Sequence, residues 1–222
     1  MQRRLINLTF HGIGRPSRRL DADEAAVWVS HERFLQVLDA VADRNDVRIT
    51  FDDGNASDVE WVLPVLRERG LTAAFFLVAG RIGRPGFVDL DGVRELSGAG
   101  MTIGCHGMRH RPWRSLDDRT LHRELAQAKN ALEKIVEQPV DVASCPFGSY
   151  DRRVLRSLRK CAFRTIYTSD TGTARPRAWL QARNTIGDGD SADHLIERIL
   201  SAEWPAYRAV HRRAKRVAKR WR

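Results

Sequence analysis

The sequence predicts an α/β fold in which short strands alternate with helices. Two kinds of segment support this prediction. Runs such as Val47–Phe51 and Leu71–Val78 are rich in β-branched and aromatic residues, and the second is almost entirely apolar, as expected for a strand buried on both faces. Segments such as His31–Val41 instead repeat apolar side chains at the helical spacing. This alternation predicts a mainly parallel sheet with crossover helices.

The remaining elements follow from the same two patterns. Residues 15–30 are polar with few apolar positions, and we expect an irregular loop there. Pro64 lies inside a helical pattern, where it can kink the helix. The expected strands are residues 5–10, 47–51, 71–78, 101–105, 140–147, 163–168 and 179–186, and the expected helices are residues 31–41, 57–69, 89–99, 117–137, 151–160 and 193–200.

Composition sets the general class of the protein. The 222 residues suffice for one domain with a substantial core, and a hydrophobic content of 42% argues against disorder in the main body. Three cysteines (Cys105, Cys145 and Cys161) form no disulfide framework, which favours a reducing compartment. We find neither a segment near the roughly 20 apolar residues of a membrane span nor a signal peptide. These observations predict a cytoplasmic protein, with peripheral attachment to the inner membrane face as an option.

Positive charge is concentrated near the C-terminus. The chain has 38 Lys and Arg against 28 Asp and Glu, and eight of the cations follow Glu203, where no acid occurs. We therefore expect a main domain over residues 1–203 and a basic amphipathic helix or tail over residues 204–222. Basic residues interleaved with Val and Trp suit an anionic membrane surface, while a solvated helix that aids solubility is the alternative. Specific nucleic-acid binding is not expected, because the tail has no base-reading motif.

The segment Val47–Gly54 resembles a strand that ends at two adjacent carboxylates. Asp52 and Asp53 follow the apolar alternation, and Gly54 permits a sharp turn. Since side chains alternate along an extended chain, the two carboxylates point in different directions from one place. One can bind a metal while the other handles a proton. Taken alone, a polar turn is the simpler interpretation of Asp-Asp-Gly.

A pair of histidines changes that balance. His106 and His110 are four residues apart, so a helical turn, or a loop that coils like one, places both imidazoles on one face. Two neutral imidazoles and one carboxylate form a usual catalytic zinc shell with an open position. Beside a strand that ends in Asp-Asp, the pair predicts a metal site.

A third segment, Ser144–Asp151, also follows a strand-like run and contains Pro146, Phe147 and Gly148. With the three motifs in this order, the sequence resembles the polysaccharide deacetylases, the NodB-type carbohydrate esterases, from about residue 5 to about residue 186. Their signatures are a Thr-Phe-Asp-Asp-Gly strand end, a His-x-x-x-His loop and a Pro-(Tyr/Phe)-Gly turn. The resemblance implies a distorted (β/α) barrel of about seven strands. The third motif is most similar to the poly-N-acetylglucosamine deacetylase branch.

The resemblance also implies an activity, which is hydrolysis of N-acetyl groups on amino sugars of a polysaccharide, such as an exopolysaccharide, or of its precursor. It implies Asp53, His106 and His110 as ligands of a divalent metal, zinc foremost, with cobalt or nickel as alternatives. It implies Asp52 as the general base. In the third motif, after Pro146, it implies that the amide of Phe147 holds the oxyanion. The nearby Tyr150 is expected to line the sugar pocket.

The sequence departs from the family pattern at two places. Ser144 stands where many relatives have an arginine that orients the catalytic aspartate, and the late Leu-x-Ile-His motif, whose histidine protonates the leaving amine, has no good match. His11, just after the first strand, is the preferred substitute acid, and a surface loop histidine is the alternative. Arg183 is expected to help position the base, and an arginine on the surface of an edge strand is the alternative. The missing acid leaves a second function open, a weak or inactive scaffold in polysaccharide assembly.

Overall fold

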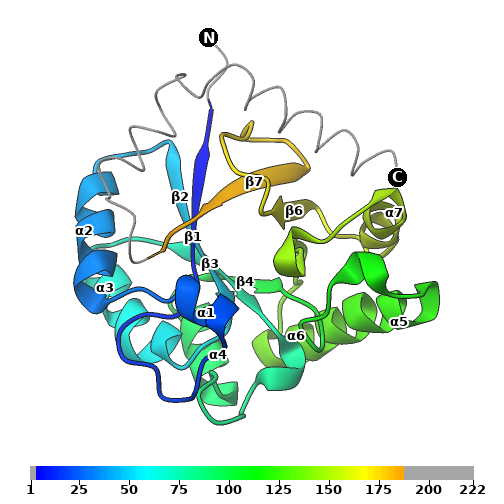
Figure 1. Ribbon diagram of the computed structural model, residues 1–222, viewed down its shortest axis with the longest axis horizontal. Coiled ribbons are helices and arrows are strands. Elements are labelled where there is room, and N and C mark those ends of the chain that lie inside the picture. The colour runs from blue at the N-terminus through cyan, green and yellow to red at the C-terminus, as the bar shows by residue number, and fades with distance from the viewer. Residues whose placement is uncertain (1–3, 188–222) are drawn as a thin grey trace.

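A computed structural model describes residues 4–187, and these residues form a closed barrel of seven parallel strands (Figure 1). Each strand pairs with the next in the chain, and the last strand closes the barrel against the first. This confirms the predicted α/β class and the seven-strand barrel. The strands are β1 Ile6–Phe10, β2 Val47–Asp53, β3 Ala73–Leu77, β4 Thr102–Cys105, β5 Val142–Ser144, β6 Thr165–Thr168 and β7 Leu180–Thr185.

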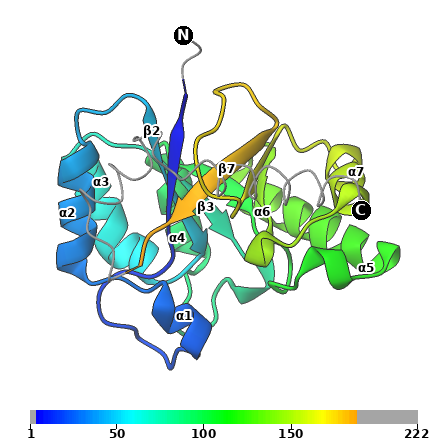
Figure 2. The same ribbon diagram turned by 45° about the horizontal axis from the view of Figure 1, so that its top comes forward.

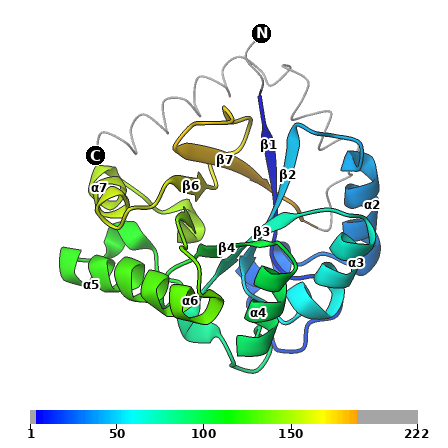
Figure 3. The same ribbon diagram turned by 180° about the vertical axis from the view of Figure 1, so that it is seen from behind.

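Helices cover the outside of the strands, as Figure 3 shows for α2, α3, α4 and α6. The α-helices are α1 Ala22–Ala26, α2 His31–Val41, α3 Leu63–Glu68, α4 Leu90–Gly98, α5 Asp118–His122, α6 Ala128–Val136 and α7 Arg152–Lys160. Two segments are π-helical, Asp58–Val62 before α3 and Arg123–Gln127 between α5 and α6. Short 3₁₀ turns occur at Ala79–Arg81, Trp113–Ser115 and Pro146–Gly148. No helix in residues 4–187 is both long and apolar enough to cross a membrane.

The structure corrects two sequence predictions. Residues 15–30 were expected to be irregular, but they contain α1 (Figure 2). This helix begins at a capping box formed by Asp21 and Glu24. The expected strand at 140–147 is reduced to β5, because its last residues turn into the Pro146–Gly148 segment. Pro64 lies shortly after the π-helical segment Asp58–Val62, in a helical run that continues into α3. The predictions for residues 193–200 and 204–222 lie outside the described residues.

The core consists of a layer between the barrel and its helices and of the barrel interior. In the outer layer Phe51 of β2 stacks between Phe10 of β1 and Phe75 of β3, with ring centroids 5.5 Å and 4.8 Å apart, and Phe34 of α2 packs edge-on. The alternate side chains of the same strands occupy the interior, which is partly polar. There the Thr9 and Thr50 hydroxyl oxygens lie 2.9 Å apart.

Parallel pairing brings the carboxyl ends of the strands to one end of the barrel, where barrel enzymes place their sites. β1 leads to His11, β2 ends at Asp53, and β4 leads to His106. The 3₁₀ turn of the third motif follows β5. The fold therefore brings the predicted motifs, which are up to about a hundred residues apart in sequence, to one opening.

Candidate metal centre and active site

The two adjacent aspartates at the end of β2 face different partners. Asp53 has a φ of 79°, a left-handed conformation that non-glycine residues seldom adopt. Asp52 keeps its side chain inside the barrel, toward β5 and β7, whereas Asp53 turns toward the loop after β4. Backbone strain of this kind is often found at functional sites and persists only where the surroundings hold it.

The two histidines lie on a loop and not on a helix, yet their rings are 5.0 Å apart. His106 follows β4 directly, and its Nδ1 donates to the Ser144 carbonyl oxygen at 2.9 Å. This bond turns Nε2 toward Asp53. His110 has a φ of 53°, and the left-handed bend brings its ring back beside that of His106.

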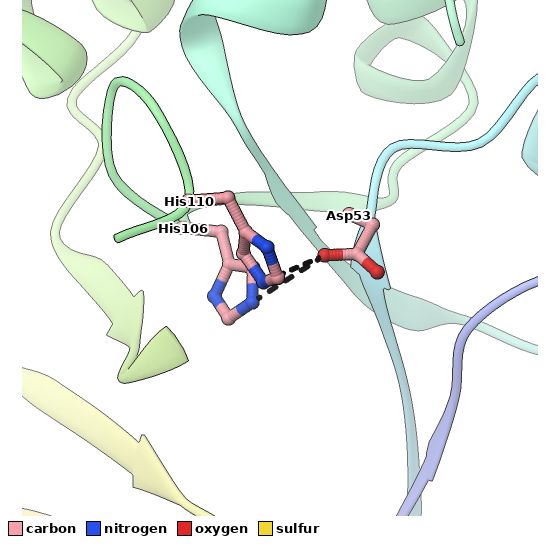
Figure 4. Close-up of side chains that lie close together, drawn as sticks. All are labelled: Asp53, His106 and His110. Carbon is pink, nitrogen blue, oxygen red and sulfur yellow. Dashed lines mark ion pairs between the residues drawn. The ribbon is translucent and has the colours of Figure 1, made fainter. Parts of the chain in front are cut away.

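Asp53, His106 and His110 form a compact group of potential metal ligands (Figure 4). One donor atom from each lies within 4.8 Å of the others, and Asp53 Oδ1 is 3.1 Å from His110 Nε2 and 3.7 Å from His106 Nε2. That oxygen is buried without a hydrogen-bond partner in residues 4–187. Burial, with smaller effects of His106 and other charges, lowers the pKa of His110 to about 4, so its imidazole is neutral near pH 7. One carboxylate and two neutral imidazoles fit a divalent cation with an open position.

Asp52 is fixed by an arginine of β7, a strand that is separated from β2 only by β1. Arg183 of β7 is 1% exposed, and its guanidinium donates to both Asp52 oxygens, at 2.7 Å and 2.6 Å. Burial alone would raise the pKa of Asp52, but the charges of Arg183 and His106 and the hydrogen bonds from Arg183 outweigh it and hold the pKa well below its usual range. Asp52 is therefore an ionised carboxylate in a fixed orientation.

Ser144 occupies the position where many relatives have an arginine, and it completes this arrangement. Its hydroxyl lies 3.2 Å from Asp52 Oδ2 and accepts from Arg183 Nη2 at 2.5 Å. The arginine that contacts the aspartate thus comes from β7 instead of β5. The small serine side chain leaves room for it in the barrel interior, which is consistent with the role predicted for Arg183.

His11 lies at the same opening, beside both aspartates. It lines the central cavity, and its Nδ1 is buried without a hydrogen-bond partner in the described part of the chain. Burial lowers its pKa, while the negative charges of Asp53 and Asp52 oppose that shift. His11 therefore shares the cavity wall with both aspartates, and burial favours its neutral imidazole in the free protein.

The third motif contributes one aromatic side chain and one turn. Phe147 is 62% exposed, has a φ of 56°, and places its ring 4.6 Å from that of His110. Gly148 and Ser149 donate the hydrogen bonds of the turn, so the Phe147 amide is outside them. Pro146 is buried and does not line the cavity.

Tyr150 does not lie where the sequence predicted. We expected it to line the sugar pocket, but it is fully buried, and its hydroxyl donates to Asp170. The cavity wall does not include it. The hydrogen bond of its phenol joins the segment before α7 to the loop after β6.

A cavity of about 390 Å³ connects the predicted residues to others that the sequence did not single out. Its walls include Asp52, Asp53, both histidines of the loop and Phe147. They also include Arg81, whose Nη2 is 3.5 Å from His110 Nδ1, and Trp28, whose ring packs against Gly12. These residues follow no chemical motif, and only the aromatic character of Trp28 within a polar stretch gave a signal.

Known proteins resemble this chain in sequence and in fold. The sequence profile of the polysaccharide deacetylase family matches residues 39–166. YxkH of Bacillus subtilis, which is named after the same family, is 27% identical over 128 residues, or 58% of this chain and 46% of its own length. The peptidoglycan-N-acetylglucosamine deacetylase of Bacillus cereus is 28% identical over 71% of this chain and 69% of its own length.

The fold is shared with a solved enzyme. The Streptococcus pyogenes deacetylase PplD, solved in complex with acetate, superposes with a TM-score of 0.77 over 90% of this chain and 99% of that chain, at 19% identity. At this identity the likeness concerns the fold alone. The family profile, however, spans more than half of the chain and includes the aspartate pair, both histidines and the Pro-Phe-Gly turn. This chain therefore belongs to the polysaccharide deacetylase family.

Proposed function

We propose that this protein is a metal-dependent hydrolase that removes N-acetyl groups from amino sugars of a polysaccharide or its precursor. One observation carries the proposal. Asp53 Oδ1, buried and without a hydrogen-bond partner in residues 4–187, faces the Nε2 atoms of His106 and His110, beside an ionised Asp52. Family membership and the name of the Bacillus cereus relative, which specifies N-acetylglucosamine, support this substrate class.

The ligand set suits zinc, with cobalt or nickel as alternatives. A bound divalent metal would supply two kinds of chemistry here, polarisation of the amide carbonyl and a lower pKa for a bound water. Asp53, His106 and His110 would hold it. The bond between His106 Nδ1 and the Ser144 carbonyl fixes the ring with Nε2 toward the site, as expected for a metal-binding histidine.

The residues around the ligands have separate roles in proton transfer, oxyanion stabilisation and sugar binding. Asp52, held ionised by Arg183, takes the proton of the attacking water. The Phe147 amide, outside the hydrogen bonds of its turn, is available for the developing oxyanion. We assign to His11, which lies in the cavity wall, the transfer of a proton to the leaving amine. Burial favours the neutral imidazole, so His11 first takes up a proton and then gives it to the amine. The Phe147 ring offers an exposed apolar face to the sugar.

The proposal is tested by acetate release from N-acetylglucosamine oligomers, measured on zinc-loaded protein. We expect Asp52→Asn to lower the rate by about 10²- to 10⁴-fold, because the proton acceptor is lost. Zinc content should stay the same, since Asp52 is not one of the three ligands. Asp91→Asn is the matched control, because Asp91 is an exposed residue of α4 that pairs with Arg94.

Two outcomes would count against the proposal. Undiminished activity of Asp52→Asn would remove Asp52 as the base. A wild-type protein that binds zinc but releases no acetate from several N-acetylated glycans would favour a scaffold of the same fold.

A further inference from the structure

We propose that Glu124 is a positioning residue of the metal centre, which holds the loop that carries both histidines. This inference rests on the proposed metal site and extends it to a residue outside the cavity. Glu124 lies in the π-helical segment between α5 and α6, far from the three sequence motifs. It is 3% exposed, and a buried carboxylate is costly unless hydrogen bonds satisfy it.

The partners of Glu124 are backbone groups of the histidine loop. Its Oε2 accepts from the Met108 amide at 2.9 Å and from the Arg109 amide at 3.0 Å. Both donors lie between His106 and His110. One side-chain oxygen thus accepts from two consecutive amides and fixes the middle of the loop.

The opposite edge of the loop is held as well. The Ala79 amide donates to the Gly107 carbonyl at 3.0 Å, and the Gly80 amide donates to the Met108 carbonyl at 2.9 Å. The loop is therefore clamped between the end of β3 and Glu124. Gly107 and Met108 are thus both held by backbone hydrogen bonds.

The sequence of the loop is adapted to this contact. Gly107 has a φ of 84°, and a Cβ atom at this position would lie 2.9 Å from Glu124 Oε2. Only glycine combines this backbone conformation with so close an approach of the carboxylate. His110 needs a left-handed φ to bring its ring beside His106, and such a conformation persists only where its surroundings hold it.

Glu124 therefore acts on the metal through the backbone of its ligands. Without an acceptor at this point, two loop amides lose their partner, and His110 loses the constraint that keeps it 5.0 Å from His106. Replacing outer residues that orient metal ligands typically weakens affinity by 10- to 100-fold. We expect a change of that size at Glu124.

The experiment compares two replacements of nearly equal volume. Glu124→Gln keeps an oxygen that can accept from both amides, whereas Glu124→Met fills the space without a strong acceptor. Zinc affinity is measured by competition with a chromophoric chelator, and the geometry of the site is measured from the visible spectrum of the cobalt-loaded protein. Urea unfolding of the metal-free form shows that each variant is folded.

We expect Glu124→Met to bind zinc about 10- to 100-fold more weakly and to change the cobalt spectrum, while Glu124→Gln stays within about tenfold of wild type. Glu133→Met is the matched control. Glu133 lies on α6, pairs with Lys129 and accepts from the Val140 amide, so it makes the same kinds of contact away from the loop. Its zinc affinity and cobalt spectrum should match wild type.

The possible outcomes separate this inference from the proposed function. Wild-type affinity and spectrum in Glu124→Met would overturn the inference and leave the deacetylase proposal intact. If Glu124→Met binds zinc more weakly and the wild type releases no acetate, the inference is supported and the proposed function is contradicted. A wild type that binds no metal would overturn both. If Glu124→Met does not fold without metal, Glu124→Asp decides, because its shorter side chain cannot reach both amides, and it should also weaken zinc binding.

Discussion

The two halves of the site differ in how the fold holds them. The base side consists of Asp52, Arg183 and Ser144, which lie on strands of the barrel and satisfy one another through hydrogen bonds in the interior. The metal side combines the strained end of β2 with a loop. It contains a buried Asp53 oxygen that has no hydrogen-bond partner among residues 4–187, and a left-handed His110.

This difference indicates which half of the site has its side chains fixed before any ligand binds. Strand residues with mutual hydrogen bonds are preorganised, so Asp52 is held in its orientation before any ligand binds. On the metal side, a carboxylate oxygen lies close to two imidazole nitrogens, and not every pair of these atoms is joined by a hydrogen bond. A bound cation therefore stabilises this side most. Stability of the metal-free protein should therefore depend on the base side, and metal-linked stability on the metal side.

The largest expected effect comes from breaking the base side. Arg183→Met should lower the free energy of unfolding by about 3–5 kcal/mol, because it leaves the Asp52 carboxylate buried without a cation. Urea unfolding of the metal-free protein measures this change. Arg94→Met removes an exposed partner of Asp91 and should cost less than about 1 kcal/mol.

A double variant tests whether the loss comes from the isolated charge. Asp52→Asn combined with Arg183→Met should be more stable than Arg183→Met alone, since no buried carboxylate then remains. If Arg183→Met is no less stable than the Arg94→Met control, the base side is not held by this ion pair, and the contrast between the two halves is wrong.

The sequence revealed most of the fold because the signals are local. Apolar runs and helical spacing lie within single segments, and the three motifs fix which strand ends meet. The helix α1 was missed because it is only five residues long and its apolar residues are all alanines, although Asp21 and Glu24 form a recognisable capping box. The π-helical segments were hidden for another reason, since their apolar spacing is close to that of an α-helix.

Contacts across the barrel were harder to predict than the ligands. Arg183 was expected near the base by resemblance, but its bond to Asp52 joins residues 131 apart and depends on the closure of β7 against β1. Tyr150 was misplaced because nothing in its neighbourhood of the sequence shows that Asp170 lies beside it in the core. Glu124 gave a signal that was overlooked, an acidic residue at an inward position between Leu121 and Ala128 of an amphipathic helix.

The effect of zinc on the free energy of unfolding should depend on the metal side and not on the base side. At a free zinc concentration 100 times the dissociation constant, the wild-type protein should gain about 2.7 kcal/mol of unfolding free energy. His110→Ala should lose most of this gain, yet its metal-free form should change by no more than about 1 kcal/mol, because His110 lies on a loop and is only partly buried. Asp52→Asn should keep the full zinc-linked gain. The comparison fails if His110→Ala and Asp52→Asn respond to zinc in the same way.

The smallest expected effect concerns pH at the metal side. Burial and the charges of His106 and Arg81 lower the pKa of His110 to about 4, against the opposing charges of Asp53 and Asp52. Only neutral imidazole binds a metal, so protonation of His110 should not weaken cobalt binding until the pH falls well below 6.5. Arg81→Gln removes one of the charges that lower this pKa, and the pKa of His110 should therefore rise. The acid limb of cobalt binding, followed by visible absorbance, should move to higher pH in Arg81→Gln and stay in place in the control Arg84→Gln. An unchanged acid limb, or a shift toward lower pH, in Arg81→Gln would contradict this effect of Arg81 on His110, whose Nδ1 lies 3.5 Å from Arg81 Nη2.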